Sequence, residues 1–206
     1  MQFIDTLTGE NKKSYQEAYF VKQDPTKSYF ISGKAGIGKT FLALQLIKEE
    51  LRLNPVKSEF ISNLPNPDSE NLAPDFESTF FEFVKAQDII QIARQQYSDH
   101  ATEKHEAKMA IKGWKSREVL IIDDLGAENT TEFAKAVLFD IIDYRHDRKD
   151  QNQTIITSNV KLEDLAKTYS DRTTSRIKGM CEMVQFQNQI DLRNVNKIYE
   201  AVAKLA

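Results

Sequence analysis

The chain has 206 residues, of which 40% are hydrophobic and 29% are charged, and its formal net charge at pH 7 is −3. This length suits one α/β domain with a substantial core, so we expect a single domain over residues 1–206. The acidic balance argues against a protein that coats nucleic acid through bulk positive charge. No apolar run approaches a membrane-spanning length and no signal-peptide core precedes the first strand, which predicts a cytoplasmic protein that does not bind membranes.

Apolar runs with strand character alternate along the chain with helical patterns. The expected strands are 28–32, 79–84, 119–122, 154–158 and 183–186, and the expected helices are 39–51, 86–97, 101–112, 130–146, 162–169 and 173–181. This alternation predicts an α/β fold with a five-stranded parallel sheet and helices on both of its faces. Ligands of such sheets bind at the carboxyl ends of the strands.

Three segments lie outside this alternating pattern. Residues 1–27 form an N-terminal extension, whose apolar side chains either dock a partner or pack against the domain's own sheet. Residues 54–77 hold four of the five prolines and predict an irregular insertion between the first helix and the second strand. Residues 191–206 predict an amphipathic C-terminal helix, whose apolar side serves either internal packing or a partner.

The sequence GKAGIGKT follows the first expected strand and matches the phosphate-binding loop G-x-x-x-x-G-K-[ST]. Its glycines let successive backbone N–H groups point at phosphate oxygens, and the following helix adds its positive dipole end. We expect Lys39 to reach the β- and γ-phosphates of ATP and Thr40 to hold Mg²⁺. The residues expected to surround the nucleotide are Gly33, Lys34, Ala35, Gly36, Ile37, Gly38, Lys39, Thr40 and Phe41.

A group of basic residues recurs at near-helical spacing in and after the expected helix 101–112. It consists of Lys104, Lys108, Lys112, Lys115 and Arg117. Acidic residues are interleaved with them, so the group is either a solvated helix face or a face that contacts DNA.

Two acids end the next expected strand, in the run VLIIDDLGAE. Buried aliphatic residues followed by acids are typical of the second half of a phosphate-loop nucleotidase. We assign Asp123 to the Mg²⁺ shell and Asp124 to polarising the attacking water. Cys181 is the single cysteine and no histidine has ligand spacing with it, so any metal should be nucleotide-bound Mg²⁺.

Two later positions complete the predicted site. Asn159 ends the strand QTIITSN, where its amide can hydrogen-bond both a nucleophilic water and a γ-phosphate oxygen. Arg172 and Arg176 lie one turn apart near the start of the last expected helix. An arginine offered to a neighbouring subunit's γ-phosphate can raise the hydrolysis rate by about 10³–10⁵, although an exposed helical arginine needs no catalytic explanation.

Taken together, GKAGIGKT, VLIIDDLGAE, TIITSN and the SRI at 175–177 resemble the AAA+ ATPases of the DnaC/DnaI-type replicative helicase loaders, a group that includes the IstB transposition helpers. The resemblance implies a three-layer P-loop NTPase of the AAA+ (ASCE) type, without a separate lid domain. It implies that Asn159 is the sensor-1 residue and that Arg176 is an arginine finger acting in trans, with Arg172 in reserve. It also implies a homo-oligomer with ATP between subunits, and as partners a replicative DNA helicase and single-stranded DNA.

The group's loaders usually carry an N-terminal helicase-binding domain, whereas fewer than thirty residues precede the first strand here, as in a phage-like or reduced loader. We therefore favour an ATP-hydrolysing helicase loader and keep two alternatives. One is an IstB-like transposition helper that binds duplex DNA, and the other is an adaptor that binds a nucleotide without hydrolysing it. A small-molecule kinase fits less well, because the paired acids and the arginine-bearing helix poorly match an acceptor-binding lid.

Overall fold

The computed structural model describes residues 27–53 and 81–186. Except for Lys27, the predicted N-terminal extension (1–27), the irregular insertion (54–77) and the C-terminal helix (191–206) lie outside the described residues. These boundaries, and the assignment of one domain over 1–206, stay predictions.

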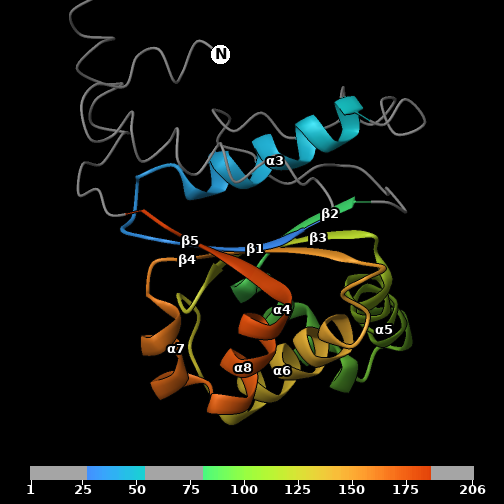
Figure 1. The fold of residues 1–206 in the computed structure, drawn as a ribbon. Coiled ribbons are helices and arrows are strands. Elements are labelled where there is room, and N and C mark those ends of the chain that lie inside the picture. The colour runs from blue at the N-terminus through green and yellow to red at the C-terminus, as the bar shows by residue number, and fades with distance from the viewer. Residues whose placement is uncertain (1–26, 54–80, 187–206) are drawn as a thin grey trace, which may run out of the picture.

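Within the described residues the chain forms one parallel sheet covered by helices on both faces. The strands are β1 (Ser28–Ser32), β2 (Phe81–Lys85), β3 (Val119–Leu125), β4 (Gln153–Ser158) and β5 (Cys181–Gln185). The helices are α3 (Lys39–Leu53), α4 (Ala86–Arg94), the 3-10 helix η3 (Gln95–Tyr97), α5 (Ala101–Ser116), α6 (Glu132–His146), α7 (Leu162–Thr168) and α8 (Asp171–Met180). The strand order is β2-β3-β4-β1-β5, and every neighbouring pair is parallel. Figure 1 shows α3 on one face of the sheet and α4 to α8 on the other, which confirms the three-layer α/β fold.

Each central strand contributes to a core on both of its faces. On β3, Val119 and Ile121 join the apolar cluster beneath α3, while Leu120 and Ile122 join the cluster beneath the other helices. Parallel strands that are covered on both faces tend to be near-continuous apolar runs. The uninterrupted run VLII therefore reflects the position of β3 inside the sheet.

Several element boundaries differ from the sequence predictions by a few residues, and two of the differences lie where α8 meets β5. The helix expected at 173–181 ends at Met180, and the strand expected at 183–186 begins two residues earlier, at Cys181. The cause is pairing with β1, which aligns Cys181 with Ser28 and continues to Gln185. Hydrophobic periodicity within one segment carries no information about such a partner strand.

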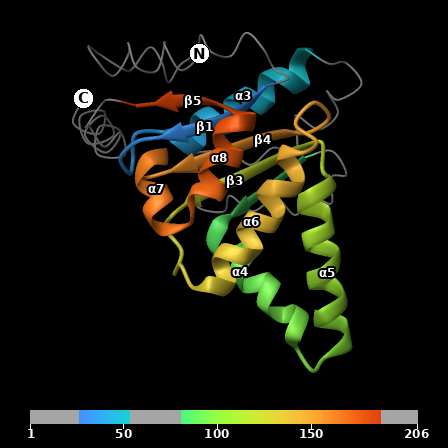
Figure 2. The ribbon, with the colours of Figure 1, turned by 60° about the horizontal axis from the view of Figure 1, so that its bottom comes forward.

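Helix α5 runs four residues beyond its predicted end at 112. The extension buries Trp114, whose indole N–H donates to Glu82 Oε1 at 2.7 Å. In Figure 2, α4, η3 and α5 form a helical hairpin whose tip points away from the sheet. No helix in the described part of the chain combines the length and the apolar character needed to cross a membrane.

Candidate nucleotide-binding site

The loop between β1 and α3 has the backbone shape that its glycines predict. Gly36 and Gly38 have φ angles of 78° and 88°, in the left-handed region that favours glycine. At Gly33 a side chain would come within 2.3 Å of Ile37 Cδ1. Ile37 is buried, whereas residues 34–35 are exposed, so the loop is anchored on the core and open to solvent above it. This is the arrangement that a phosphate-binding loop requires.

Lys39 connects this loop to the end of β4. Its Nζ donates to the backbone carbonyl of Lys34 at 2.9 Å and to Asn159 Oδ1 at 2.7 Å. The Asn159 amide nitrogen in turn lies 3.4 Å from Asp124 Oδ1, a long hydrogen bond. Three residues predicted separately for phosphate binding, γ-phosphate sensing and water activation are thus brought together. Phe41, the last of the predicted nucleotide residues, is partly buried and packs against the core.

Asp123 is buried at the end of β3, with 2% of its surface exposed. Its Oδ1 accepts hydrogen bonds from Thr157 Oγ1 at 2.7 Å and from Thr40 Oγ1 at 2.8 Å. Burial raises the pKa of Asp123, and the nearby charge of Asp124 also raises it, whereas the two hydroxyl groups lower it. The buried carboxylate is therefore stabilised chiefly by neutral donors, and a cation at this position would stabilise it further.

Asp124 lies in a β-bulge, which the sequence did not predict. Ile122 pairs with Ile156 and Leu125 with Ser158, so β3 contains one residue more than β4 between these pairs. Asp124 takes a φ of 55°, a left-handed conformation that aspartate tolerates better than most residues. In a regular strand two consecutive side chains point to opposite faces. The bulge instead turns Asp124 towards the half-exposed side of the site, next to Asn159.

Thr157 has a part in the site that sequence reasoning missed. Its Oγ1 donates to Asp123 and also accepts the backbone N–H of Asp124 at 2.9 Å. It therefore holds both acids of the bulge from the neighbouring strand. Thr157 lies two residues before Asn159 in the run TSN. Nothing in the sequence, however, separates a buried strand threonine that binds site residues from an ordinary core threonine.

Glu128 is a second buried carboxylate near the end of β3. Its Oε2 accepts the backbone N–H of Gly126 at 3.0 Å, and Oε1 has no hydrogen-bond partner among the described residues. Burial raises the pKa of Glu128. This hydrogen bond closes the turn that follows Asp124, so Glu128 stabilises the backbone next to the bulge.

Arg176 and Arg172 lie outside this hydrogen-bond network. Arg176 Nε donates to Asp143 Oδ1 of α6 at 2.6 Å. The Arg172 guanidinium lies over the ring of Phe139, also of α6, with 4.8 Å between its carbon and the ring centroid. Within one subunit, both arginines are thus held on the face of α8 that packs against α6.

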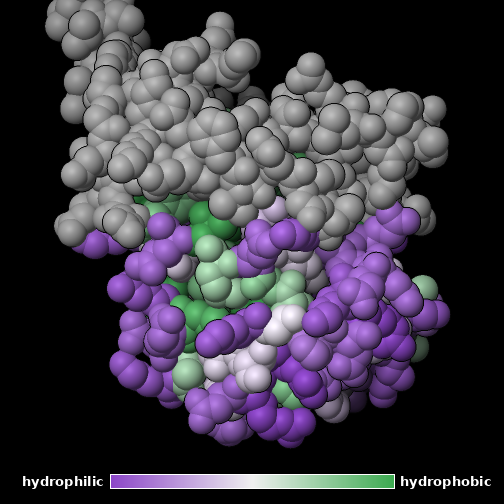
Figure 3. Space-filling view, viewed as in Figure 1, coloured by the Kyte–Doolittle hydropathy of each residue, from purple (hydrophilic) through white to green (hydrophobic). Residues whose placement is uncertain are grey.

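The basic group around α5 divides into two parts. Lys115 pairs with Asp140 at 2.6 Å and Arg117 with Glu82 at 3.1 Å, so these two cations stabilise the fold. Lys104, Lys108 and Lys112 are exposed and make no ion pair with the described residues. In Figure 3 the surface around α5 is almost entirely hydrophilic. The large apolar side chains exposed on this hairpin are Tyr97 and Met109.

The donor set suits Mg²⁺ held jointly with phosphates. No group of three or more His, Cys, Asp or Glu side chains among the described residues could hold a metal ion without help. Thr40 Oγ1 and Asp123 Oδ1, 2.8 Å apart, offer one hydroxyl and one carboxylate. Mg²⁺ in nucleotide sites takes one or two such protein ligands and completes its shell with phosphate oxygens and water. The residues present therefore fit a nucleotide-bound Mg²⁺.

The fold is shared with solved structures of replication proteins. The DnaC helicase loader matches with a TM-score of 0.62 and 20% identity, over 88% of this chain and 92% of that one. DnaI matches with a TM-score of 0.58 and 20% identity, over 88% and 87% of the two chains. DnaA from Aquifex aeolicus, bound to AMPPCP, matches with a TM-score of 0.59 and 19% identity, over 91% of this chain but only 50% of that one. At these identities the matches establish the fold.

Sequence comparison shows the family to which this chain belongs. No curated protein sequence gives a significant match. The model of the IstB-like ATP binding proteins matches residues 79–197, which is more than half of the chain and includes β3, β4 and α8. The phosphate-binding loop precedes the matched region and adds independent support. This chain therefore belongs to the family of IstB-like ATP binding proteins, as its motifs predicted.

Proposed function

We propose that this protein hydrolyses ATP and, as a homo-oligomer, loads a replicative DNA helicase in the cytoplasm. The observation that carries the proposal is a hydrogen-bonded cluster in which Lys39, Asn159 and Asp124 are connected. Thr157 joins this group to Asp123, which in turn binds Thr40. Membership in a family of ATP-binding proteins supports the ATP site. The common fold with the DnaC helicase loader and DnaI supports the role in replication.

In this proposal the β1–α3 loop and Lys39 bind the triphosphate. The N–H groups of residues 34–38 face the phosphate oxygens, whereas that of Gly33 donates to the Ser158 carbonyl at 3.1 Å. Lys39 Nζ exchanges its contact with Asn159 for the β- and γ-phosphates. Thr40 and Asp123 hold Mg²⁺. When bound, that ion neutralises charge on the β- and γ-phosphate oxygens.

Hydrolysis then depends on Asp124 and Asn159. Asp124 accepts a proton from a water molecule whose oxygen attacks the γ-phosphorus, while the bond from that phosphorus to the β–γ bridging oxygen breaks and ADP leaves. Asn159 hydrogen-bonds the water and a γ-phosphate oxygen. The half-exposed position of Asp124, beside the Asn159 amide, suits these roles better than the buried position of Asp123.

The proposal places Arg176 of one subunit against the ATP of the next. A lone subunit lacks that guanidinium at its own site, so it hydrolyses ATP slowly. Single-stranded DNA is the proposed second ligand, and Lys104, Lys108 and Lys112 with the exposed Tyr97 provide charge and an aromatic surface for it. We also propose that residues 1–206 form one AAA+ domain.

The test is the rate of ATP hydrolysis per subunit as a function of protein concentration, with mass measured in the same samples. We expect specific activity and oligomer mass to rise together when ATP is present. Arg176→Ala should lower activity by about a hundredfold or more while ATP still binds. Lys178→Ala, an exposed cation on the same helix, is the matched control and should act like the wild type. Flat specific activity, with Arg176→Ala as active as the wild type, contradicts the oligomeric loader.

A second candidate is a transposition helper, which the family model's name favours. Such a protein uses the same ATP site but binds duplex target DNA. Its affinity for duplex DNA should then fall steeply with salt, whereas a loader should prefer single strands and a helicase. The remaining alternative is an adaptor that binds ATP without hydrolysing it. It is excluded if the wild type hydrolyses ATP at a measurable rate and Asp124→Asn abolishes that hydrolysis.

A further inference from the structure

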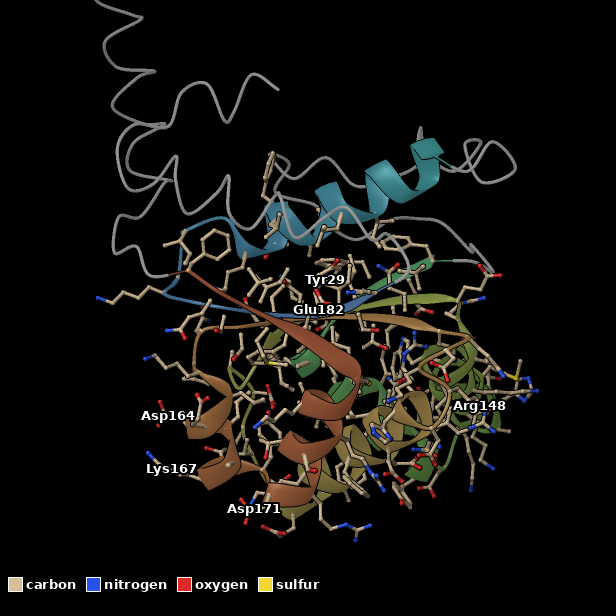
Figure 4. The ribbon with its side chains drawn as sticks, viewed as in Figure 1. Tyr29, Arg148, Asp164, Lys167, Asp171 and Glu182 are labelled. Carbon is tan, nitrogen blue, oxygen red and sulfur yellow. The ribbon has the colours of Figure 1, made fainter. Side chains whose placement is uncertain are left out.

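The two arginines of α8 are paired with two residues of α6 in matching order. Arg172 and Arg176 are four residues apart, and so are Phe139 and Asp143, so each pair lies on one face of its helix. Arg172 stacks on Phe139 and Arg176 binds Asp143. The α6–α8 contact thus holds both guanidinium groups in defined positions. Figure 4 marks the start of α8 at Asp171, at the edge of the helical layer away from the sheet.

Asp143 engages only one edge of the Arg176 guanidinium. The bond runs from Nε to Oδ1 at 2.6 Å, and neither Nη group donates to another described residue. A guanidinium has five donors in a rigid planar fork. A single bond at Nε therefore fixes the direction of the fork and leaves the four Nη hydrogens for another acceptor.

The pair is neither a buried ion pair nor a fully solvated one. The Arg176 side chain is 37% exposed and that of Asp143 is 31% exposed. Arg176 therefore remains reachable from outside the subunit while its long side chain is restrained. A restrained cation loses less conformational entropy when it contacts a phosphate than one that moves freely in water.

We propose that Asp143 is a positioning residue for Arg176: it orients the guanidinium so that its Nη edge meets the γ-phosphate bound in a neighbouring subunit. This inference rests on the proposed function, because it requires Arg176 to act in trans. Asp143 itself touches neither nucleotide nor water. Its effect should therefore appear in the rate of hydrolysis and not in nucleotide affinity.

The test compares kcat and KM for ATP in Asp143→Asn, Arg176→Ala and the double variant, at protein concentrations that saturate assembly. We expect Asp143→Asn to lower kcat by about tenfold to a hundredfold with little change in KM. The double variant should be no slower than Arg176→Ala, because Asp143 acts through Arg176. Asp140→Asn removes an exposed carboxylate from the same helix and is the matched control. Thermal unfolding of each variant verifies that it is folded.

Mixing subunits separates action in trans from damage within one subunit. Lys39→Ala removes a subunit's own ATP site but leaves its Asp143 and Arg176 intact. Mixed with Asp143→Asn, it should supply a correctly positioned arginine and raise activity above the sum of the two proteins alone. Failure of this rescue, or a kcat for Asp143→Asn equal to or above the wild type, overturns the inference. If Arg176→Ala is itself fully active, the failure belongs to the proposed function instead.

Discussion

The native surroundings of the Asp123 side chain disfavour its negative charge. It is buried beside a second carboxylate, and the groups that bind it directly are hydroxyls. Because burial raises its pKa, the native state binds more protons than the unfolded state at pH values between the ordinary and the raised pKa. The free energy of unfolding therefore falls as pH rises through that window, and the loss persists at neutral pH.

We predict that Asp123→Asn stabilises the nucleotide-free protein and abolishes Mg²⁺-dependent ATP hydrolysis. At about pH 7 the free energy of unfolding should rise by about 1–2 kcal/mol, because the substitution removes the cost of a buried charge. The gain should shrink as the pH is lowered towards 4. Urea denaturation across this range measures both effects. Asp99→Asn, which changes an exposed aspartate, should show neither, and a loss of stability in Asp123→Asn at neutral pH contradicts the argument.

At the scale of elements, Arg145 links its own helix α6 to the end of α5 and to strand β4 of the sheet. It is fully buried on α6, and its guanidinium donates to the backbone carbonyls of Trp114, Lys115 and Arg117 near the end of α5. It also donates to the carbonyl of Gln153 and to Thr154 Oγ1 on β4. Burial lowers its pKa to about 10, so it remains charged at neutral pH. Its charge is satisfied mainly by carbonyl oxygens, three of them at the end of α5, where helix carbonyls lack intrahelical donors.

We predict that Arg145→Met lowers the free energy of unfolding by about 3–5 kcal/mol, because several buried carbonyl groups lose their donor at once. Urea denaturation measures this loss. Arg148→Met is the matched control: Arg148 lies on the Tyr144 ring at 3.8 Å, at the outer edge of the helical layer in Figure 4. Its replacement should cost about 1 kcal/mol or less. Equal effects of the two substitutions would show that the buried hydrogen bonds of Arg145 contribute little.

At the scale of the whole molecule, the site draws residues from three sheet segments and from α3. The loop after β1, the bulge of β3 and the end of β4 meet only when the sheet is assembled. A nucleotide that contacts all three binds the folded state and not the unfolded chain. It should therefore stabilise the whole fold by mass action.

We predict that Mg²⁺–ATP at about one hundred times its Kd raises the free energy of unfolding by about 2.7 kcal/mol. Trp114 is the single tryptophan and is buried on α5, so its fluorescence reports unfolding at a distance from the nucleotide. The Lys39→Ala variant should lose most of the shift. A nucleotide-dependent shift that survives in Lys39→Ala would place binding elsewhere.

The sequence by itself determined the local chemistry and the order of elements. The glycines of the β1–α3 loop, the run VLIIDD and the strand before Asn159 are short-range patterns, because backbone freedom, burial on both faces and strand termini are local properties of the chain. The tertiary structure decided what depends on partners distant in sequence. The bulge that turns Asp124, the Thr157 hydroxyl that holds both acids, the start of β5 at Cys181 and the pairing of Arg176 with Asp143 all arise from contacts between segments. Such contacts form only after the sheet has fixed which segments are neighbours, so no pattern within one segment could reveal them.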